Sequence, residues 1–305
     1  QEGAAALLEA DSNPYAALFP MPVIPETANF FPASSDKHMA TYRWPAAANT
    51  RMPAKGTVVL LHGYGDHLGR FNHVAGFFCE KGYQVMGADL PLHGQSEDAD
   101  GENGYLPSFD YIVDSWTEYV QCEVVQCPSP HLLYSHGAGS LCALLALDQG
   151  LAKTWTQLEV VVFSAPLLRQ PGSLAAHACF CCNPGCTQVA AKLGQLTNYG
   201  ALQEVTSEDP LYFGETQNLS WARGLQRATE EVQDVLDRVT YPVLVLQSPN
   251  DQLADPDASR ELFSRAQSGR KKLEEFAFRS SMHELHNEKE WRRPLEFALR
   301  FWEER

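Results

Sequence analysis

Reactive side chains follow three apolar runs in this sequence. The run His131–Tyr134 leads into Ser135-His-Gly-Ala-Gly-Ser140, and the run Pro242–Gln247 leads into a loop that holds Asp251. A third apolar run, near the end of the chain, leads to His283. An aspartate that orients a histidine, which in turn takes a proton from a nucleophile, is the arrangement used in acyl transfer. The chain order of these three loops therefore predicts a hydrolytic triad.

The first loop has the residue types of a nucleophile elbow, G-x-S-x-G, in which a strained strand-to-helix turn raises one side chain above a sheet. Small residues at Ser135, Gly137 and Gly139 fit this turn, because strand and helix backbones approach closely there. A helical apolar pattern follows at Leu141–Leu145. Gly137 occupies the position where the nucleophilic serine is expected. Moving the frame to Ser135 or Ser140 takes the hydroxyl off the apex of the turn.

The other members of the site have defined roles in this prediction. His283 acts first as base and then as acid, while Asp251 fixes its imidazole tautomer and stabilises the cation. Asp255, in the same loop as Asp251, is the alternative carboxylate, although loop aspartates often only shape turns. An oxyanion hole needs two backbone N–H groups, and those of Tyr64 and Ala138 are the candidates.

Strands and helices alternate along the chain, which predicts a doubly wound, mostly parallel α/β sheet. Strands are expected at residues 57–61, 84–90, 131–134, 158–163, 242–247 and 273–278, after a hairpin at 29–31 and 39–44, and those at 57–61 and 158–163 are expected to be buried. Helices are expected at residues 71–81, 108–126, 257–267 and 291–304. Loops at the carboxyl ends of parallel strands meet at one edge of the sheet. The three reactive loops are therefore expected to converge.

The chain divides into three parts on this pattern. Residues 1–26 are rich in Ala and Pro, and we expect them to run over the surface. Residues 27–166 and 238–305 contain all the expected strands and form the core. Residues 167–237 show helical pieces and no strand pattern, so they are expected to form an inserted helical cap.

Composition restricts the partners of the protein. The chain is 44% hydrophobic, enough for a substantial core, and its formal net charge of −15 argues against binding nucleic acid or anionic membranes electrostatically. No apolar run approaches the roughly 18–20 residues of a membrane span. Because the chain begins at Gln1, we expect a processed or trimmed product from which any signal peptide is gone. The compartment stays open between the cytoplasm and export.

The cysteines and histidines do not form a recognisable metal motif. Cys179, Cys181, Cys182 and Cys186 cluster without paired C-x2-C spacing, so plain packing in the cap is favoured over a local disulfide, and a disulfide over zinc. The other cysteines, at 79, 122, 127 and 142, are expected to be small core or helix residues. His62, His67 and His286 are expected to shape loops. We expect neither a metal ion nor a cofactor.

The loops and strands together resemble those of α/β hydrolases of the monoacylglycerol lipase, lysophospholipase and serine aminopeptidase group. The resemblance extends from about Asn29 to Trp302. Five motifs in the family's order carry it: Leu61-His-Gly-Tyr-Gly-Asp-His-Leu-Gly-Arg-Phe71, Ala88-Asp-Leu-Pro-Leu-His-Gly-Gln-Ser96, Phe163-Ser-Ala-Pro166, Val243-Leu-Val-Leu-Gln247 and Met282-His-Glu-Leu-His-Asn-Glu288. The resemblance implies the α/β-hydrolase fold, a helical cap over an apolar acyl pocket, and a Ser-Asp-His triad.

The chain departs from the family at the elbow, where the family has Gly-His-Ser-(Met/Gln)-Gly-Gly. Three explanations fit Gly137: a serine replaced by design, a natural pseudoenzyme, or a chemistry that needs no nucleophile. A long-inactive enzyme has no reason to keep its acid, base and oxyanion loop. Because Asp251, His283 and the loop around Tyr64 are all present, the sequence favours a designed replacement, in which glycine also relaxes the strained turn.

The resemblance implies a carboxylic ester hydrolase that acts on a lipid-like or other apolar acyl ester through an acyl-enzyme at position 137. With Gly137, the chain is expected to be largely inactive. Two alternatives stay open: a pseudoenzyme that binds a small acyl ligand, and an S33-type peptidase, which needs acidic groups to hold a substrate amine. The expected partner is a small acyl ester, with peripheral contact between the cap and lipid.

Overall fold

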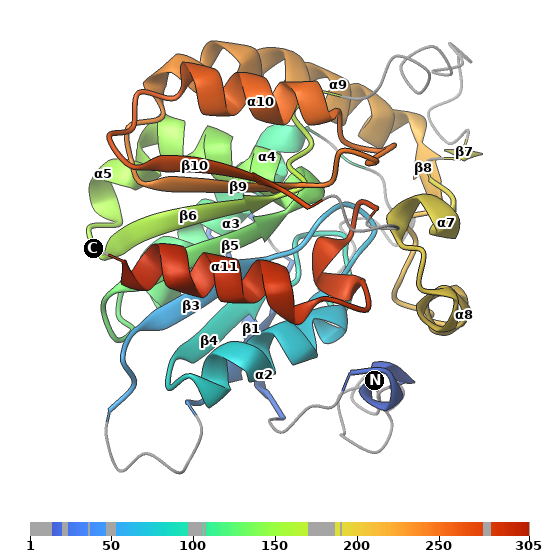
Figure 1. Cartoon of the computed structure of the whole chain (residues 1–305), viewed down its shortest axis with the longest axis horizontal. Helices are drawn as coiled ribbons and strands as arrows, with labels where there is room; N and C mark the ends of the chain where they lie inside the picture. Colours follow the sequence, from blue (N-terminus) through green and yellow to red (C-terminus); the bar gives the residue numbers. More distant parts are fainter. Residues whose placement is uncertain are drawn as a thin grey trace.

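An eight-stranded sheet forms the centre of the molecule, with helices on both of its faces (Figure 1). The computed structural model describes residues 14–19, 24–35, 37–46, 53–96, 106, 108–169, 187–189, 191–276 and 282–304. The strand order is β1-β2-β4-β3-β5-β6-β9-β10. The strands are β1 (Glu26–Phe30), β2 (Met39–Trp44), β3 (Thr57–Leu61), β4 (Gln84–Ala88), β5 (His131–His136), β6 (Leu158–Ser164), β9 (Val243–Gln247) and β10 (Lys271–Glu275).

The sheet is parallel from β4 to β10, and the β1–β2 hairpin adds two antiparallel strands at one edge. β3, β5 and β9 are buried along their whole length, which explains their continuous apolar runs. The predicted mostly parallel α/β sheet is confirmed, with strand ends that differ by a few residues from those expected.

Side chains of successive strand residues pack alternately into two apolar cores. Val59 and Leu61 of β3 point into one core, whereas Val58 and Leu60 point into the other. The first core also contains α3 (Phe109–Tyr119), α4 (Gly137–Ala146), α9 (Leu219–Glu231) and α10 (Pro256–Arg265). The second contains α2 (Asn72–Glu80) and α11 (Arg292–Glu303), which lie in front of the sheet in Figure 1.

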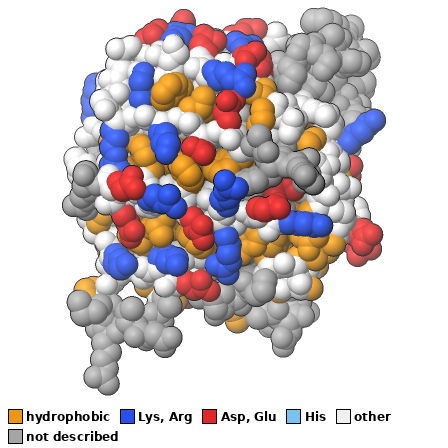
Figure 2. Space-filling model, viewed as in Figure 1, with side chains coloured by type: hydrophobic (Ala, Val, Ile, Leu, Met, Phe, Trp, Pro, Cys, Tyr) orange, Lys and Arg blue, Asp and Glu red, His pale blue; other side chains and the backbone are white. Residues whose placement is uncertain are grey.

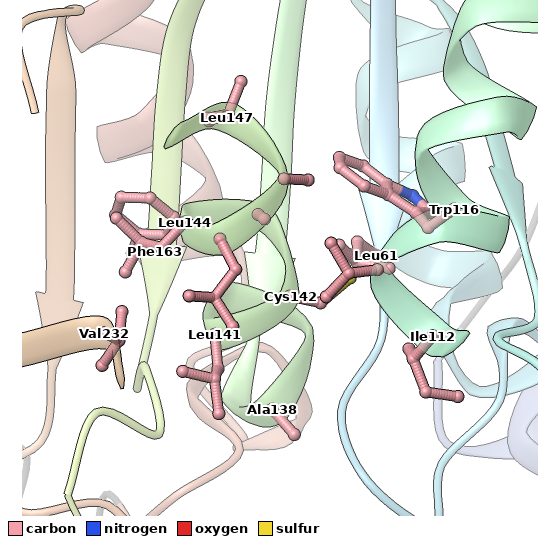
Figure 3. Packing of buried hydrophobic residues seen from close by; sticks show 14 of the residues in the cluster. Leu61, Ile112, Trp116, Ala138, Leu141, Cys142, Leu144, Leu147, Phe163 and Val232 are labelled. Carbon is pink, nitrogen blue, oxygen red and sulfur yellow. The ribbon is translucent and has the colours of Figure 1, made fainter. Parts of the chain in front are cut away.

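Helix α4 carries the elbow and is buried at every residue. Figure 3 shows α4 with Leu144 and Phe163 on one side and Cys142, Leu61 and Trp116 on the other. Because α4 is buried on all sides, residues 141–146 are all apolar and no polar face alternates with them. The elbow is thus held from both sides by the core.

The segment between β6 and β9 contains α7 (Leu193–Leu196), α8 (Gly200–Ser207) and α9. It also contains two short antiparallel strands, β7 (Thr187–Val189) and β8 (Thr216–Asn218), which the sequence did not indicate. A three-residue strand is too short to show a period of two. The described part of the expected cap is therefore mainly helical, with one small ribbon.

The N-terminal segment also differs from the expectation of a purely superficial run. Tyr15, in the short helix η2 (Pro14–Ala17), is 3% exposed, and Phe19 is 1% exposed. Phe19 stacks on His73 of α2 with ring centroids 4.1 Å apart and lies edge-on to Tyr199 of the cap segment and to Trp291. These two aromatic side chains anchor the segment between the core and α8, where composition had suggested only Ala and Pro.

The remaining helical pieces are short. They are η3 (Leu68–Phe71), η4 (Val120–Val124), η5 (Leu147–Leu151), α5 (Ala152–Thr154), η6 (Val232–Asp234), η7 (Leu236–Arg238) and η8 (Leu285–Asn287). In the described ranges, no helix combines the length and apolarity that a bilayer crossing requires. Figure 2 shows basic and acidic side chains interspersed on the face that carries α10 and α11, and some pair directly, such as Arg260 with Glu275.

Candidate active site

A sharp turn joins β5 to α4 at residue 137. Gly137 is the first residue of α4 and has a φ of +53°, a conformation that only glycine adopts without strain. Its carbonyl accepts a hydrogen bond from the Leu167 N–H at 3.0 Å, which ties the turn to the segment after β6. Gly139 has no room for a side chain, because a Cβ there would lie 2.2 Å from the His62 carbonyl oxygen.

The two serines beside the elbow do not face the other site residues. Ser135 Oγ lies 3.0 Å from Ser140 Oγ, and it donates to the Val162 carbonyl at 3.2 Å. Both side chains are fully buried between β5, β6 and α4. Neither serine is therefore available as a nucleophile, in agreement with the frame that puts Gly137 at the apex.

Asp251 and His283 form a hydrogen-bonded pair, with His283 Nδ1 2.8 Å from Asp251 Oδ2. The other carboxylate oxygen of Asp251 accepts the N–H groups of Leu253 and Ala254, at 2.8 and 3.0 Å. Gln247, the last residue of β9, donates its side-chain amide to Oδ2 at 3.1 Å. These contacts fix Asp251 rigidly at the carboxyl end of β9.

The pair has the electrostatics of an orienting carboxylate and a base. Burial by itself raises the pKa of Asp251, but the charge and hydrogen bond of His283 and the two backbone N–H groups lower it overall. Burial by itself lowers the pKa of His283, but the charge and hydrogen bond of Asp251 raise it overall. An ionised Asp251 accepts the Nδ1 proton, so the lone pair of neutral His283 resides on Nε2.

His283 Nε2 faces the apex of the elbow. A Cβ built on Gly137 lies 3.3 Å from this nitrogen and 3.7 Å from the Cα of Gly63. The structure therefore brings Gly137, Asp251 and His283 together, although they are far apart in the sequence. Asp255 lies elsewhere: it caps α10 through the Asp257 N–H and pairs with Arg169.

The two backbone N–H groups expected in the oxyanion hole come from the loop after β3 and from the first turn of α4. The loop after β3 passes beside the elbow, since the Gly63 Cα is 3.7 Å from the Cβ position of residue 137. Within the described residues, no acceptor takes a hydrogen bond from the N–H of Tyr64 or Ala138. Ala138 lies at a helix N-terminus, where the backbone dipoles favour negative charge.

The loop of Tyr64 is held by the segment before α9. Tyr64 Oη donates to the Thr216 carbonyl at 2.7 Å, and the Phe213 N–H donates to the Gly65 carbonyl at 2.9 Å. A Cβ on Gly65 would lie 2.3 Å from the Gly214 Cα, so the two backbones touch. The ring of Tyr64 also contacts Trp221 of α9, with centroids 4.8 Å apart.

A buried ion network next to His283 was not recognised from the sequence. Arg70 is 1% exposed; its two amino groups bind both carboxylate oxygens of Glu284 at 2.9 and 2.7 Å, and one of them also binds Asp66 at 2.7 Å. Asn287 donates to Glu284 at 2.8 Å. The network joins the loop after β3 to the loop of His283. All four residues lie inside two motifs quoted above, but only the fold shows that these motifs meet.

The histidines around the site have structural contacts. His62 Nε2 accepts from the Leu90 N–H at 2.9 Å, and its Nδ1 lies 2.8 Å from the Gly63 carbonyl. His67 Nε2 is 2.8 Å from Asp209 Oδ2, which also accepts the Tyr15 hydroxyl at 2.6 Å. His62 and His67 therefore shape loops, as the sequence suggested.

His136 lies between the site and the second core. Its Nδ1 is 3.0 Å from the Ser164 carbonyl, and its ring is 4.6 Å from that of His283 and 4.7 Å from that of His286. Burial, followed by the charge of His283, lowers its pKa to about 3. Neither nitrogen of His286 has a hydrogen-bond partner among the described residues. Both rings are held neutral by their surroundings.

None of the four described cysteines forms a hydrogen bond with Asp251 or His283. Cys79 and Cys142 are buried core residues, as predicted, whereas Cys127 is half-buried and Cys122 is exposed on η4. The expected cluster at Cys179, Cys181, Cys182 and Cys186 lies outside the described residues.

Comparison with known proteins identifies the family. The family model described as "Serine aminopeptidase, S33" (Hydrolase_4) matches residues 52–290. Caffeoylshikimate esterase of Arabidopsis thaliana is 28% identical over 233 residues, covering 72% of this chain and 68% of the esterase. Monoglyceride lipase of Rattus norvegicus is 26% identical over 242 residues, covering 77% of both.

Solved structures agree on the fold. A soluble variant of monoglyceride lipase from Saccharomyces cerevisiae, in complex with a substrate analog, superimposes with a TM-score of 0.75 and 16% identity. The match covers 92% of this chain and 96% of that one. The resemblance that the motifs predicted is confirmed. The chain belongs to the serine aminopeptidase S33 family, and it is an α/β hydrolase of the lipase and esterase type.

Proposed function

We propose that the parent activity of this chain is hydrolysis of an apolar acyl ester by a triad at positions 137, 251 and 283. The observation that carries the proposal is the geometry of His283. Its Nδ1 is bonded to Asp251 at 2.8 Å, and its Nε2 lies 3.3 Å from the Cβ position of residue 137. A hydroxyl on that Cβ is within hydrogen-bond reach of the base.

With serine at position 137, the reaction has two steps. The serine oxygen attacks the ester carbonyl as His283 takes its proton, and the backbone N–H groups of Tyr64 and Ala138 stabilise the oxyanion. His283 then protonates the leaving alcohol, and a water molecule hydrolyses the acyl-enzyme by the same route. Asp251 keeps the imidazole in the required tautomer throughout.

Gly137 removes the first step, because it has no oxygen to form the acyl-enzyme. The remaining groups retain the oxyanion donors and substrate binding, which supply roughly 10³–10⁴-fold catalysis over water in a triad enzyme that has lost a member. We therefore propose that the chain, as it stands, turns over esters slowly and forms no covalent intermediate.

The substrate class follows from the surroundings of the oxyanion loop and from the relatives. Rings of Phe213, Trp221 and His93 lie within 4.8 to 5.9 Å of the Tyr64 ring, so this side of the loop is apolar and aromatic. Two of the curated relatives, caffeoylshikimate esterase and monoglyceride lipase, carry names that describe ester hydrolysis. An ester of an apolar acid and a polar alcohol fits the aromatic surroundings of Tyr64 and the names of these relatives. Peripheral contact between the cap and lipid would bring such an ester to the site.

The test restores the missing oxygen. Gly137→Ser should react with a fluorophosphonate and hydrolyse p-nitrophenyl esters of graded chain length, with a preference for acyl chains longer than acetyl. The control is the double variant Gly137→Ser with His283→Gln, which should neither label nor turn over. A folded Gly137→Ser chain that cleaves aminoacyl p-nitroanilides and no ester would replace the esterase proposal with a peptidase.

A further inference from the structure

We propose that the His283–Asp251 pair of this glycine-bearing chain activates a water molecule beside Gly137, which attacks activated esters directly, without an acyl-enzyme. The inference rests on the proposed function, because it uses the same ester site. It differs in predicting that the chain is a slow enzyme with its own mechanism, in which the base is still needed.

The first support is the position of the base. His283 Nε2 has no hydrogen-bond partner among the described residues, and it faces the Cβ position of Gly137 at 3.3 Å. A water oxygen close to that position can donate to Nε2, as a serine hydroxyl would. The His283 side chain is 10% exposed, so the base is not sealed from solvent.

The second support is that the pair is set up as a base and not merely buried. Asp251 is held by hydrogen bonds from two backbone N–H groups and from Gln247, and its remaining contact is with His283 Nδ1. This arrangement leaves Nε2 as the proton acceptor. The orientation of His283 does not depend on a hydroxyl at position 137, because the hydrogen bond from Nδ1 to Asp251 fixes the ring.

The third support is the charge around His283. Asp251 faces it from the loop after β9, Asp66 contributes from the loop after β3, and Glu284 contributes from its own loop. The neutral rings of His136 on β5 and His286 on η8 are the other titratable neighbours. Among the described residues, these three carboxylates outnumber Arg70, the guanidinium that pairs with Asp66 and Glu284, and their excess negative charge stabilises the imidazolium that forms when His283 accepts a proton.

The step balances as an ordinary ester hydrolysis. The water oxygen forms a bond to the acyl carbon while one water proton moves to His283 Nε2. The N–H groups of Tyr64 and Ala138 hold the oxyanion. The acyl carbon–alkoxy oxygen bond then breaks, His283 returns the proton to the alkoxide, and the products are one carboxylic acid and one alcohol.

The test compares the unaltered chain with His283→Gln and Asp251→Asn, using p-nitrophenyl butyrate as the probe. His283→Gln should lower the residual kcat/KM by about 10²-fold, the lower range for general-base catalysis. His38, the half-buried residue before β2 whose ring lies 5.8 Å from that of Phe31, is outside the site, so His38→Gln is the matched control and should leave the rate unchanged. A residual rate that is the same with His283→Gln overturns the inference, because oxyanion stabilisation and binding would then account for all of it.

Two further measurements use the chain without substitution. Its residual activity should resist a fluorophosphonate and show no acyl adduct in intact-mass spectra during turnover. The rate should also rise with pH through one ionisation above 6.5, the ordinary pKa of histidine, because His283 must be neutral. A rate that does not change between about pH 5 and 8 contradicts the inference. This measurement needs no substitution, so it also applies if His283→Gln and Asp251→Asn do not fold.

The outcomes separate this inference from the proposed function. The first case is that Gly137→Ser reacts with the fluorophosphonate and hydrolyses esters, but His283→Gln does not change the slow rate of the glycine chain. In that case only the water mechanism is wrong. If Gly137→Ser stays inert while the unaltered chain loses its rate with His283→Gln, the serine-esterase parentage is wrong and the water mechanism stands.

Discussion

The backbone at residue 137 is held at a φ of +53°, with the Nε2 of His283 above it and the Gly63 Cα beside it. A side chain in this conformation is strained, typically by 1–3 kcal/mol. Glycine avoids that strain but removes the oxygen that the surrounding groups are arranged to activate. At residue 137, glycine therefore favours the stability of the fold, whereas serine would favour covalent catalysis.

Asp251 is expected to control the ionisation of His283. In a Gly137→Ser background, Asp251→Asn should lower kcat by about 10⁴-fold, because the imidazole loses its orienting carboxylate. The pKa of His283 is raised by Asp251, so without this charge the pKa falls and the acid limb of the pH–rate profile moves to lower pH. The measurement is kcat/KM between pH 5 and 9. An acid limb that stays in place would assign the raised pKa to other groups.

At the residue scale, the sequence was sufficient to predict that Gly137, Asp251 and His283 lie together, because each follows a strand and the strand ends converge; their catalytic roles stay a prediction. The Arg70–Glu284 pair could not be predicted in this way. The two residues are 214 positions apart, and no local pattern says which arginine meets which glutamate.

The elements around the site are joined by that buried pair. Burial by itself raises the pKa of Glu284, but the charge and hydrogen bonds of Arg70 lower it overall. Glu284→Gln should lower the free energy of unfolding by about 3 kcal/mol, because Arg70 then keeps only Asp66 as a charged partner. Urea denaturation at pH 7 measures this change.

The matched control for that prediction is Asp255→Asn. Asp255 pairs with Arg169, whose side chain is 43% exposed, and asparagine preserves the cap of α10. The expected loss is below about 1 kcal/mol. Equal losses in the two variants would show that the buried network does not fix the loop of His283.

The first turn of helix α4 packs closely against the end of β3 and the loop that follows it, so its residues there must be small. A Cβ on Gly139 would lie 2.2 Å from the His62 carbonyl oxygen, on the strand side of the elbow. Gly139→Ala should therefore destabilise the fold by about 1–3 kcal/mol, the usual cost of overpacking a core. Gly200→Ala, at an exposed site with no atom within 4 Å, should be neutral or slightly stabilising. Thermal unfolding of both variants shows whether the steric contact at residue 139 or the backbone flexibility of glycine explains why residue 139 must be small.

At the element scale, the sequence predicted the eight strands of the main sheet and the helices beside them, and continuous apolar runs marked the buried strands β3, β5 and β9. It missed β7 and β8, whose three residues show no period. It also missed the burial of Tyr15 and Phe19, because the Ala- and Pro-rich composition of their segment conceals two anchoring aromatics.

The molecule as a whole buries many histidines, and this should make it sensitive to acid. Burial is the largest cause that lowers the pKa in six of them: His62, His73, His93, His131, His136 and His286. For His73 and His93 the pKa falls to about 4, and for His136 to about 3. Two others, His67 and His283, have raised pKa values.

The sign of the effect follows from proton binding. Below pH 6.5 the unfolded chain takes up protons at the six histidines, while the folded chain does not, so the free energy of unfolding falls as pH drops from 6.5 toward 4. His67 and His283 act in the opposite direction: the stability that they contribute is complete below pH 6.5 and is lost as the pH rises through their raised pKa values. Each unopposed histidine contributes about 1.4 kcal/mol per pH unit. Urea midpoints that stay constant between pH 7 and 5 would contradict this prediction.

The whole account depends on residue 137 being the nucleophile position of a serine esterase. The most direct measurement is fluorophosphonate labelling of Gly137→Ser, followed by peptide mapping and ester kinetics. The predicted result is stoichiometric labelling at position 137, a kcat/KM at least about 10³-fold above that of the glycine chain, and a stability lower by about 1 kcal/mol. A folded Gly137→Ser chain that takes no label at position 137 would contradict the account.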